Sequence, residues 1–326
     1  MKRKAGGIAT EIGPIRVDRD SISSNRGNSI SSRFSSSLKR SLTISWLCGA
    51  ILVGTIGGFS SAVSQDLKPR VSADIVYGHK DGLAMTMDRF EPVGKSNGIG
   101  LMFMVSGGWV SSWNPPERMM PLVAPMLQKG YTVFAIRHGS SPRYLIPEIV
   151  SDVRLAHKHI VENAKLFQVD PNKLGVYGYS AGGHLSLMLG TTSNDRSSDA
   201  PRIAAVVAVF PPTDLRPYME LSNPLREKFP ALKFELSKGV DYSPLLQVTK
   251  DDAPVLMVHG DKDELVPLWH SEKMRDALKE TGVANQLVVI EGAAHGFDAA
   301  GNKRMFDAMG DWFDQHLLGL TTKPGE

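Results

Sequence analysis

From residue 73 onward, apolar residues gather in about eight short runs that are typical of β-strands. Two of these runs, IAAVVAVF at 203–210 and PVLMVHG at 254–260, are continuous rather than alternating. Continuous runs indicate parallel strands that are covered on both faces. The predicted strands are Ala73–Tyr77, Ala84–Phe90, Gly100–Val105, Thr132–Arg137, Leu174–Tyr177, Ile203–Phe210, Val255–His259 and Gln286–Ile290.

Helical patterns separate the later strands. Between Pro147 and Phe167, apolar residues recur at spacings of three and four, and Pro147 suits a first helical turn. Pro267–Lys279 and Lys303–Leu318 follow the same pattern. This alternation predicts an α/β fold, a mostly parallel twisted sheet of about eight strands with helices on both faces. The first two strands are close in sequence, so we expect them to form a hairpin at one edge.

The segment from Asp214 to Gln247 interrupts this alternation. It lies between two apolar strands, and prolines break its periodicity at positions 217, 224, 230 and 244. A long connection at this point is either a small lid over a site or a surface insertion without a role in binding.

The first 64 residues differ in composition from the rest. Residues 1–40 are basic and rich in serine, so we expect a disordered leader. Residues 41–64 carry no charge, and Ala62-Val63-Ser64 ends the apolar run with small residues. A basic start, an apolar centre and a small-residue end are typical of a signal peptide, although the run is also long enough for an uncut membrane anchor. Either alternative predicts that residues 65–326 act outside the cytoplasm, in the periplasm or the extracellular space.

Charge and cysteine content exclude several classes of function. Residues 1–40 carry a net charge of +6 out of a total of +3, which leaves about −3 for residues 65–326. We therefore expect no nucleic-acid partner, and membrane contact only through an uncleaved N-terminal segment. The single cysteine, Cys48, lies in the apolar leader, so the main domain has no disulfide and no cysteine nucleophile. No phosphate-binding glycine loop and no metal-ligand spacing is visible, so we expect no cofactor and no metal.

The most specific chemical motif is GYSAGG, in which Ser180 stands between a predicted strand and a predicted helix. A serine at such a turn exposes its hydroxyl at a helix N-terminus, where partial positive charge favours a developing anion. A serine hydroxyl needs a base, and His295 follows the last predicted strand in a loop of small residues. The acid that orients this base is expected at Asp263, with Asp261 as a turn residue and Glu264 as a charge near a helix start.

These motifs, in the order Ser180, Asp263 and His295, resemble the α/β-hydrolase superfamily. More narrowly, residues 71–320 resemble its esterase/lipase and prolyl-oligopeptidase-catalytic-domain branch, including carbohydrate acetyl esterases. The resemblance implies an oxyanion hole made by the backbone N–H groups of Ala181 and of Gly108 or Trp109. In that branch a histidine precedes the two glycines, whereas this chain has Ser106, or Val105 when the tryptophan is aligned instead. A serine could do part of the work of orienting the turn, and which N–H group is the donor stays open.

Other polar and aromatic residues carry weaker expectations. His138, Tyr179 and Trp113 are candidates for the substrate pocket. His184 is expected to pack against its neighbours and not to act in catalysis. His259 is expected to support the loop that carries Asp263, called the acid loop below. Arg137 and Arg143 would either meet an anionic substrate group or remain solvated.

The function expected from these residues is that of an exported serine hydrolase that cleaves carboxylic esters through an acyl-enzyme. The substrate would be a small-molecule or carbohydrate ester, with acetyl or feruloyl groups on polysaccharide implied by the resemblance. Two alternatives stay open, a small serine exopeptidase of the prolyl-oligopeptidase type and a catalytically silent binding module on the same fold.

Overall fold

The structure is a computed structural model that describes residues 69–192 and 201–320. The expected leader and the expected signal or anchor segment, residues 1–64, lie outside the described residues. Within the described part of the chain, no helix combines the length and apolar character needed to cross a membrane.

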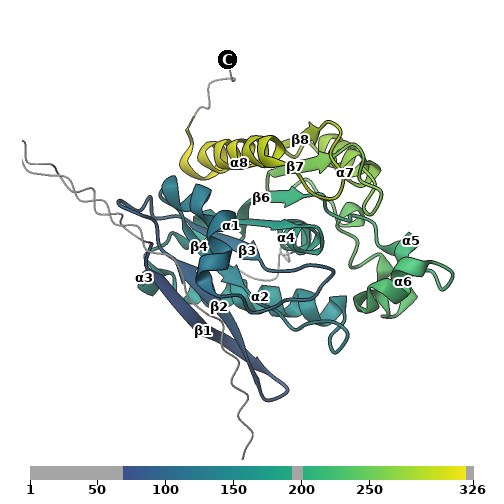
Figure 1. Ribbon diagram of the computed structural model, residues 1–326, viewed down its shortest axis with the longest axis horizontal. Helices are drawn as coiled ribbons and strands as arrows, with labels where there is room; N and C mark the ends of the chain where they lie inside the picture. Colours follow the sequence, from purple (N-terminus) through teal and green to yellow (C-terminus); the bar gives the residue numbers. More distant parts are fainter. Residues whose placement is uncertain (1–68, 193–200, 321–326) are drawn as a thin grey trace, which may run out of the picture. The chain divides into compact units, whose positions relative to one another are not determined.

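The described residues form an eight-stranded sheet with the strand order β1-β2-β4-β3-β5-β6-β7-β8 (Figure 1). β1 is antiparallel to β2, β2 is antiparallel to β4, and all later neighbours are parallel. The predicted α/β fold, mainly parallel sheet and edge hairpin are therefore confirmed. The strands are β1 (Val71–Lys80), β2 (Leu83–Phe90), β3 (Gly100–Met104), β4 (Thr132–Ile136), β5 (Leu174–Tyr179), β6 (Ile203–Val209), β7 (Val255–Gly260) and β8 (Asn285–Ile290).

Helices cover both faces of the sheet, which explains the continuous apolar strands. α1 (Pro116–Gln128) and α8 (Ala299–Phe313) bury their apolar sides in one core, and α2 (Ile146–Glu162), α4 (Ala181–Thr192) and α7 (Trp269–Glu280) bury theirs in the other. Along β3, Leu101 and Phe103 enter the first core while Met102 and Met104 enter the second. Burial on both faces removes the polar alternation that a half-exposed strand would show.

Two helices depart clearly from their predicted limits, whereas the helix predicted at Pro267–Lys279 is found at Trp269–Glu280. The helix predicted from Pro147 to Phe167 ends at Glu162, and α3 (Ala164–Phe167) follows after Asn163, whose side-chain amide donates to the carbonyl of His159. α8 begins earlier than predicted because Asp298 caps it, accepting the N–H of Gly301 at 2.8 Å. α8 then continues into a π-helical turn, η5 (Asp314–Leu318).

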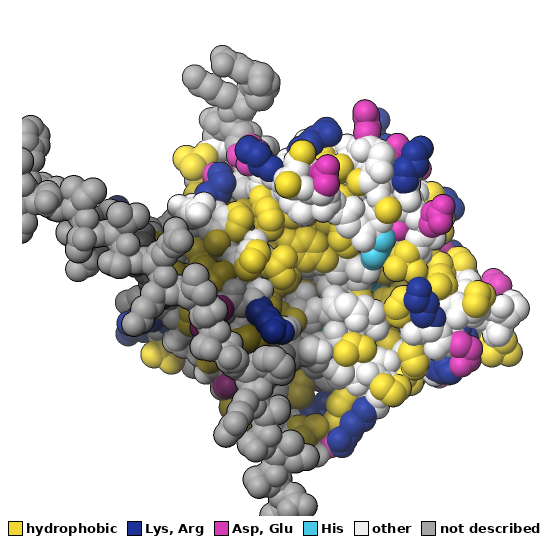
Figure 2. All heavy atoms as spheres, in the orientation of Figure 1, with side chains coloured by type: hydrophobic (Ala, Val, Ile, Leu, Met, Phe, Trp, Pro, Cys, Tyr) yellow, Lys and Arg dark blue, Asp and Glu magenta, His cyan; other side chains and the backbone are white. Residues whose placement is uncertain are grey.

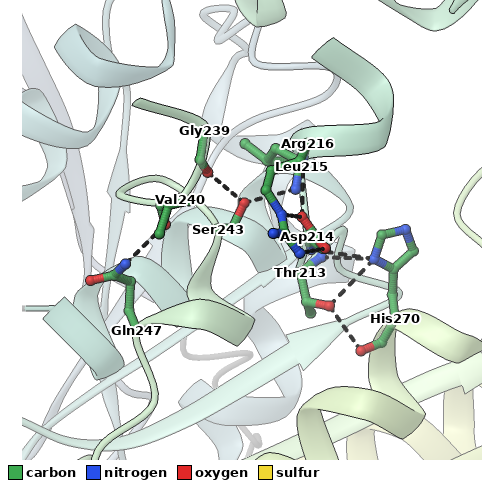
Figure 3. A network of polar contacts seen from close by, with 9 residues as sticks. All are labelled: Thr213, Asp214, Leu215, Arg216, Gly239, Val240, Ser243, Gln247 and His270. Atoms are coloured by element: carbon green, nitrogen blue, oxygen red, sulfur yellow. Dashed lines mark hydrogen bonds and ion pairs between the residues drawn. The ribbon is translucent and has the colours of Figure 1, made fainter. Parts of the chain in front are cut away.

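The proline-rich insertion folds into short helical turns on one side of the sheet (Figure 1). They are α5 (Arg216–Met219), α6 (Pro224–Lys228), η2 (Pro230–Leu232), η3 (Leu236–Gly239) and η4 (Pro244–Leu246). The two ends of the insertion are tied together (Figure 3): Ser243 Oγ accepts the N–H of Leu215 at 2.9 Å and donates to the carbonyl of Gly239 at 2.6 Å. The insertion is therefore an ordered part of the domain.

Charged side chains of both signs are interspersed on the face shown in Figure 2. Arg137, however, is buried, against the expectation that it is solvated or substrate-facing. Its guanidinium makes a bidentate ion pair with Asp88, at 2.6 and 2.9 Å, and reaches Asp74 at 2.7 Å. This cluster fastens the hairpin edge to β4. Arg143 is exposed and lies 3.5 Å from Asp81.

Replacing the buried acid should destabilise the fold strongly. Asp88→Ala leaves the Arg137 charge buried with one partner fewer, and removing one member of a buried pair costs about 3–5 kcal/mol. Urea denaturation followed by circular dichroism measures the free energy of unfolding. The matched control is Asp276→Ala, which breaks an exposed pair with Arg275 and should leave that free energy nearly unchanged. Equal effects of the two variants would contradict this account of the cluster.

Candidate active site

Ser180 occupies a strained turn between β5 and α4. Its φ is +52°, a left-handed value that is rare for residues other than glycine, and its N–H donates to the carbonyl of Val209 at 2.8 Å. The flanking glycines permit this turn. A Cβ on Gly178 would lie 2.5 Å from the carbonyl of Gly182, and a Cβ on Gly182 would lie 2.7 Å from the carbonyl oxygen of Met104. The G-x-S-x-G pattern is thus a steric requirement of packing β5, α4 and β3 together.

His295 lies between the serine and an acid. Its Nε2 is 2.9 Å from Ser180 Oγ, and its Nδ1 is 2.6 Å from Asp263 Oδ2. A proton on Nδ1 that is donated to the carboxylate leaves Nε2 as an acceptor for the serine hydroxyl. The three residues come from loops after β5, β7 and β8, because the carboxyl ends of parallel strands meet at one edge of the sheet. The structure therefore brings together the three side chains that the sequence motifs indicate.

Asp263 is the acid that reaches the histidine. Burial alone would raise the pKa of its carboxyl group. Hydrogen bonds from His259, from His295 and from the N–H of Val266 outweigh that effect and hold the pKa far below its usual range. Asp261 instead accepts the N–H of Gly292 at 2.6 Å, which fastens the acid loop to the loop that carries His295. The exposed Glu264 takes no part.

His259 braces the acid loop from below, as expected. Its Nε2–H points at both the carbonyl oxygen of Val266, at 2.7 Å, and Asp263 Oδ2, at 3.3 Å. Its Nδ1 accepts from Ser271 Oγ at 2.8 Å. This second histidine therefore also contacts the Asp263 carboxylate, and it is fully buried.

The Gly-Gly-Trp turn lies beside Ser180. Gly107 and Val110 exchange two backbone hydrogen bonds of 3.0 Å, and the two residues between them, Gly108 and Trp109, have φ values of +56° and +60°. This is a two-residue hairpin turn of the I′ kind. Both residues line the same pocket as Ser180. No hydrogen bond to another described residue occupies the N–H groups of Gly108, Trp109 or Ala181, so all three are free to meet a negatively charged oxygen.

A histidine from α4, and not Ser106, orients this turn. Ser106 Oγ is buried and has no hydrogen-bond partner among the described residues, which corrects the expected role of that serine. The indole N–H of Trp109 instead donates to His184 Nδ1 at 3.2 Å, and His184 Nε2–H donates to the carbonyl of Tyr242 at 2.8 Å. Burial lowers the pKa of His184 to about 4, so the ring stays neutral and can accept. The only sequence signal was its position four residues after Ser180.

The pocket next to Ser180 encloses about 350 Å³ of empty space, open solvent at its mouth included. Its walls are mostly apolar, and four of its residues belong to the insertion between β6 and β7. The insertion therefore forms one wall of the pocket and is not a remote surface loop. The lining residues are Gly108, Trp109, Ser180, Pro212, Tyr218, Leu225, Phe229, Leu232, Leu265 and Val266.

The three residues expected in the pocket do not line it. His138 is buried and donates from Nδ1 to the carbonyl of Gly139 at 2.8 Å. Tyr179 packs its ring against Phe103 and Phe210. Trp113 points to solvent and is 60% exposed. Nearness in sequence to the site motifs therefore did not predict which side chains line the pocket. Within the described ranges, no group of His, Cys, Asp and Glu side chains is arranged to hold a metal ion.

The strand order, the strained serine turn and the loops that meet at the sheet edge define an α/β-hydrolase. A family profile described as BD-FAE matches residues 87–278, more than half of the chain, and the chain belongs to the BD-FAE family. The matched residues include Ser180 and Asp263 and end before His295.

Individual relatives are more distant. The probable carboxylic ester hydrolase LipM of Mycobacterium tuberculosis is 27% identical over 223 residues, which cover 63% of this chain and 51% of LipM. Esterase LipQ of the same organism is 28% identical over 221 residues, with coverage of 63% and 51%. The chain thus spans about half the length of these curated relatives. Among solved structures, a truncated carbohydrate esterase from gut microbiota has a TM-score of 0.68 at 23% identity, covering 78% of this chain and 99% of that one.

Replacing His184 should slow chemistry at Ser180 without unfolding the protein. His184→Phe keeps a buried ring but leaves the Trp109 indole N–H without its acceptor, so the turn is free to rotate its donors away. We expect labelling of Ser180 by a fluorophosphonate to slow by about 10-fold or more. The effect should stay below the roughly 10²–10³-fold loss that follows complete removal of one oxyanion-hole donor. His157→Phe, a buried histidine of α2, is the matched control and should label at the unaltered rate. Equal rates for both variants would contradict the positioning role.

Buried neutral histidines should make the fold sensitive to mild acid. Burial lowers the pKa of His138, His157 and His184 to about 4 and that of His270 to about 3. The unfolded chain takes up these protons near pH 6.5. Stability is therefore fully present above about pH 6.5 and falls as the pH approaches 4, by up to about 1.4 kcal/mol per pH unit for each histidine.

Urea denaturation at pH 7 and pH 5 measures this effect above the range in which most carboxyl groups titrate. His157→Phe removes one of the four histidines and should reduce the loss between the two pH values. A wild-type free energy of unfolding that is the same at both pH values would overturn the prediction.

Proposed function

We propose that this protein is a serine esterase in which Ser180 attacks the carbonyl carbon of a carboxylic ester. The observation that supports the proposal most directly is the chain of hydrogen bonds from Ser180 Oγ through His295 to Asp263, at 2.9 and 2.6 Å. The names of the curated relatives, LipM and LipQ, support ester bonds as the target.

In the proposed reaction, His295 Nε2 takes the proton of Ser180 as Oγ bonds to the ester carbon. The negative charge moves to the carbonyl oxygen, which the N–H groups of Ala181 and of Gly108 or Trp109 stabilise. The buried Asp263 carboxylate stabilises the imidazolium that forms. His295 then gives the proton to the departing alcohol, and an acyl-enzyme remains. Water that loses a proton to His295 attacks the acyl-enzyme, and the acid leaves as Ser180 regains its proton.

The pocket supports a short acyl group. The space beside Ser180 is about 350 Å³ with the open solvent at its mouth included, so the enclosed part is smaller. An acetyl group suits this space better than a feruloyl group. The carbohydrate esterase among the structural neighbours supports a sugar alcohol on the other side of the ester. Export through residues 41–64 completes the proposal, and the mass of the protein recovered outside the cytoplasm would test whether cleavage occurs after Ser64.

Hydrolysis assays on the full chain test the activity. We expect p-nitrophenyl acetate to be cleaved faster than the octanoate, acetylated xylan to release acetate, and aminoacyl nitroanilides to react poorly. Ser180→Ala should abolish turnover, and Asp263→Asn should lower kcat by roughly 10⁴-fold, because the amide favours the wrong histidine tautomer.

Two exposed residues give matched controls. Ser151→Ala on α2 and Glu264→Gln in the acid loop should leave kcat close to that of the wild type. Faster cleavage of nitroanilides than of every ester would favour an exopeptidase. A folded protein that neither turns over esters nor takes a fluorophosphonate label would favour a silent binding module.

A further inference from the structure

The pocket carries one polar side chain that the proposed reaction does not use. Of the side chains that line it, only Ser180 and Tyr218 have a hydroxyl group. The indole N–H of Trp109 is already bonded to His184. Tyr218 belongs to α5 in the insertion, whose other contributions to the pocket are apolar: Leu225, Phe229 and Leu232. A phenol hydroxyl in an apolar wall is costly unless it has a hydrogen-bond partner.

The partner on the protein side is His270, and its tautomer is set by the backbone. His270 Nδ1 accepts the N–H of Thr213 at 3.1 Å, while Thr213 Oγ1 donates to the carbonyl of His270 at 2.9 Å (Figure 3). An Nδ1 that accepts an N–H carries no proton of its own. Burial holds the pKa of His270 at about 3, so the ring is neutral and its one proton is on Nε2.

This tautomer decides the direction of the next hydrogen bond. His270 Nε2 lies 2.5 Å from the Tyr218 hydroxyl oxygen. Because Nε2 bears the proton, it donates and the tyrosine oxygen accepts. The proton of Tyr218 itself then has no acceptor among the described residues. Burial, with the nearby charges of Asp263 and Asp214, raises the pKa of Tyr218 to about 12, so the phenol keeps that proton at neutral pH.

The proposed reaction places the acyl side of the substrate in this pocket. It is lined by the Gly108–Trp109 turn and by Ser180, which bind the carbonyl group in the proposed reaction, and His295 does not line it. His295 delivers a proton to the alcohol, so the alcohol leaves on the histidine side and the acyl group occupies the pocket.

We propose that Tyr218 is a specificity-determining residue that donates a hydrogen bond to an oxygen atom in the acyl group of the ester. The preferred acyl group is then short and bears a hydroxyl, ether or keto oxygen in addition to its carbonyl. This inference rests on the proposed esterase function and names a chemical class of acyl group for the same site.

Pairs of esters that differ by one atom test the proposal. In the first pair, p-nitrophenyl methoxyacetate has an ether oxygen where the butanoate has a methylene group. In the second pair, the 3-methoxypropanoate has an ether oxygen where the pentanoate has a methylene group, and this oxygen is one atom further from the carbonyl carbon. The ratio of kcat/KM within each pair is measured for wild type and for Tyr218→Phe. The greater intrinsic reactivity of the methoxy esters cancels when the two proteins are compared.

Removing the phenol should lower the methoxy-to-alkyl ratio by about 5- to 10-fold in at least one pair, which is the value of one neutral hydrogen bond. Hydrolysis of the all-carbon ester should persist in Tyr218→Phe, and this shows that the site is intact. Tyr131→Phe removes a phenol hydroxyl bonded to Asp314, away from the pocket, and should keep the wild-type ratios.

Ratios that agree within twofold between wild type and Tyr218→Phe in both pairs would overturn the inference, as would an equal loss of activity on both members of each pair. Failure of the esterase proposal looks different. In that case wild type and Ser180→Ala would hydrolyse the all-carbon esters equally poorly, and Ser180 would take no fluorophosphonate label.

Discussion

The close contact between β3, β5 and α4 is the constraint on which the site depends. A Cβ on Gly182 would clash with the Met104 carbonyl oxygen, and a Cβ on Gly178 would clash with the backbone of Gly182. That contact holds Ser180 at a positive φ and aims its hydroxyl above the sheet edge. It also places the Gly-Gly-Trp turn, which follows β3, next to the start of α4. One steric condition therefore positions both the proposed nucleophile and the proposed anion-stabilising groups.

Histidine side chains make several of the hydrogen bonds that arrange the site, and their roles differ with their burial. His295 is partly accessible and bridges Ser180 and Asp263. His184 and His270 are buried and neutral, so each has one donor and one acceptor nitrogen. A neutral imidazole has one proton. When a partner donates to one ring nitrogen, the proton is on the other nitrogen, which must then act as the donor. In this way His184 orients the Trp109 turn and His270 orients the hydroxyl of Tyr218.

The insertion between β6 and β7 links these histidines to the pocket. Tyr242 accepts from His184 through its backbone, and Tyr218 accepts from His270 through its hydroxyl. The same segment supplies the apolar wall opposite Ser180. Its prolines begin short helical turns, so a segment without long-range periodicity still has a defined path.

Local patterns in the sequence determined the strands, the hairpin edge, the serine turn and the order of the three site residues. Those features depend on residues a few positions apart, as in the continuous apolar run of β6 or the glycines around Ser180. The tertiary structure alone decided that His184 supports the turn, that Arg137 is buried, and that Tyr218 lines the pocket while His138, Tyr179 and Trp113 do not. These outcomes join residues such as Trp109 and His184, or Tyr218 and His270, whose approach depends on how whole elements pack. A loop side chain takes its direction from the partners it meets, and those partners are set by the fold and not by its neighbours in sequence.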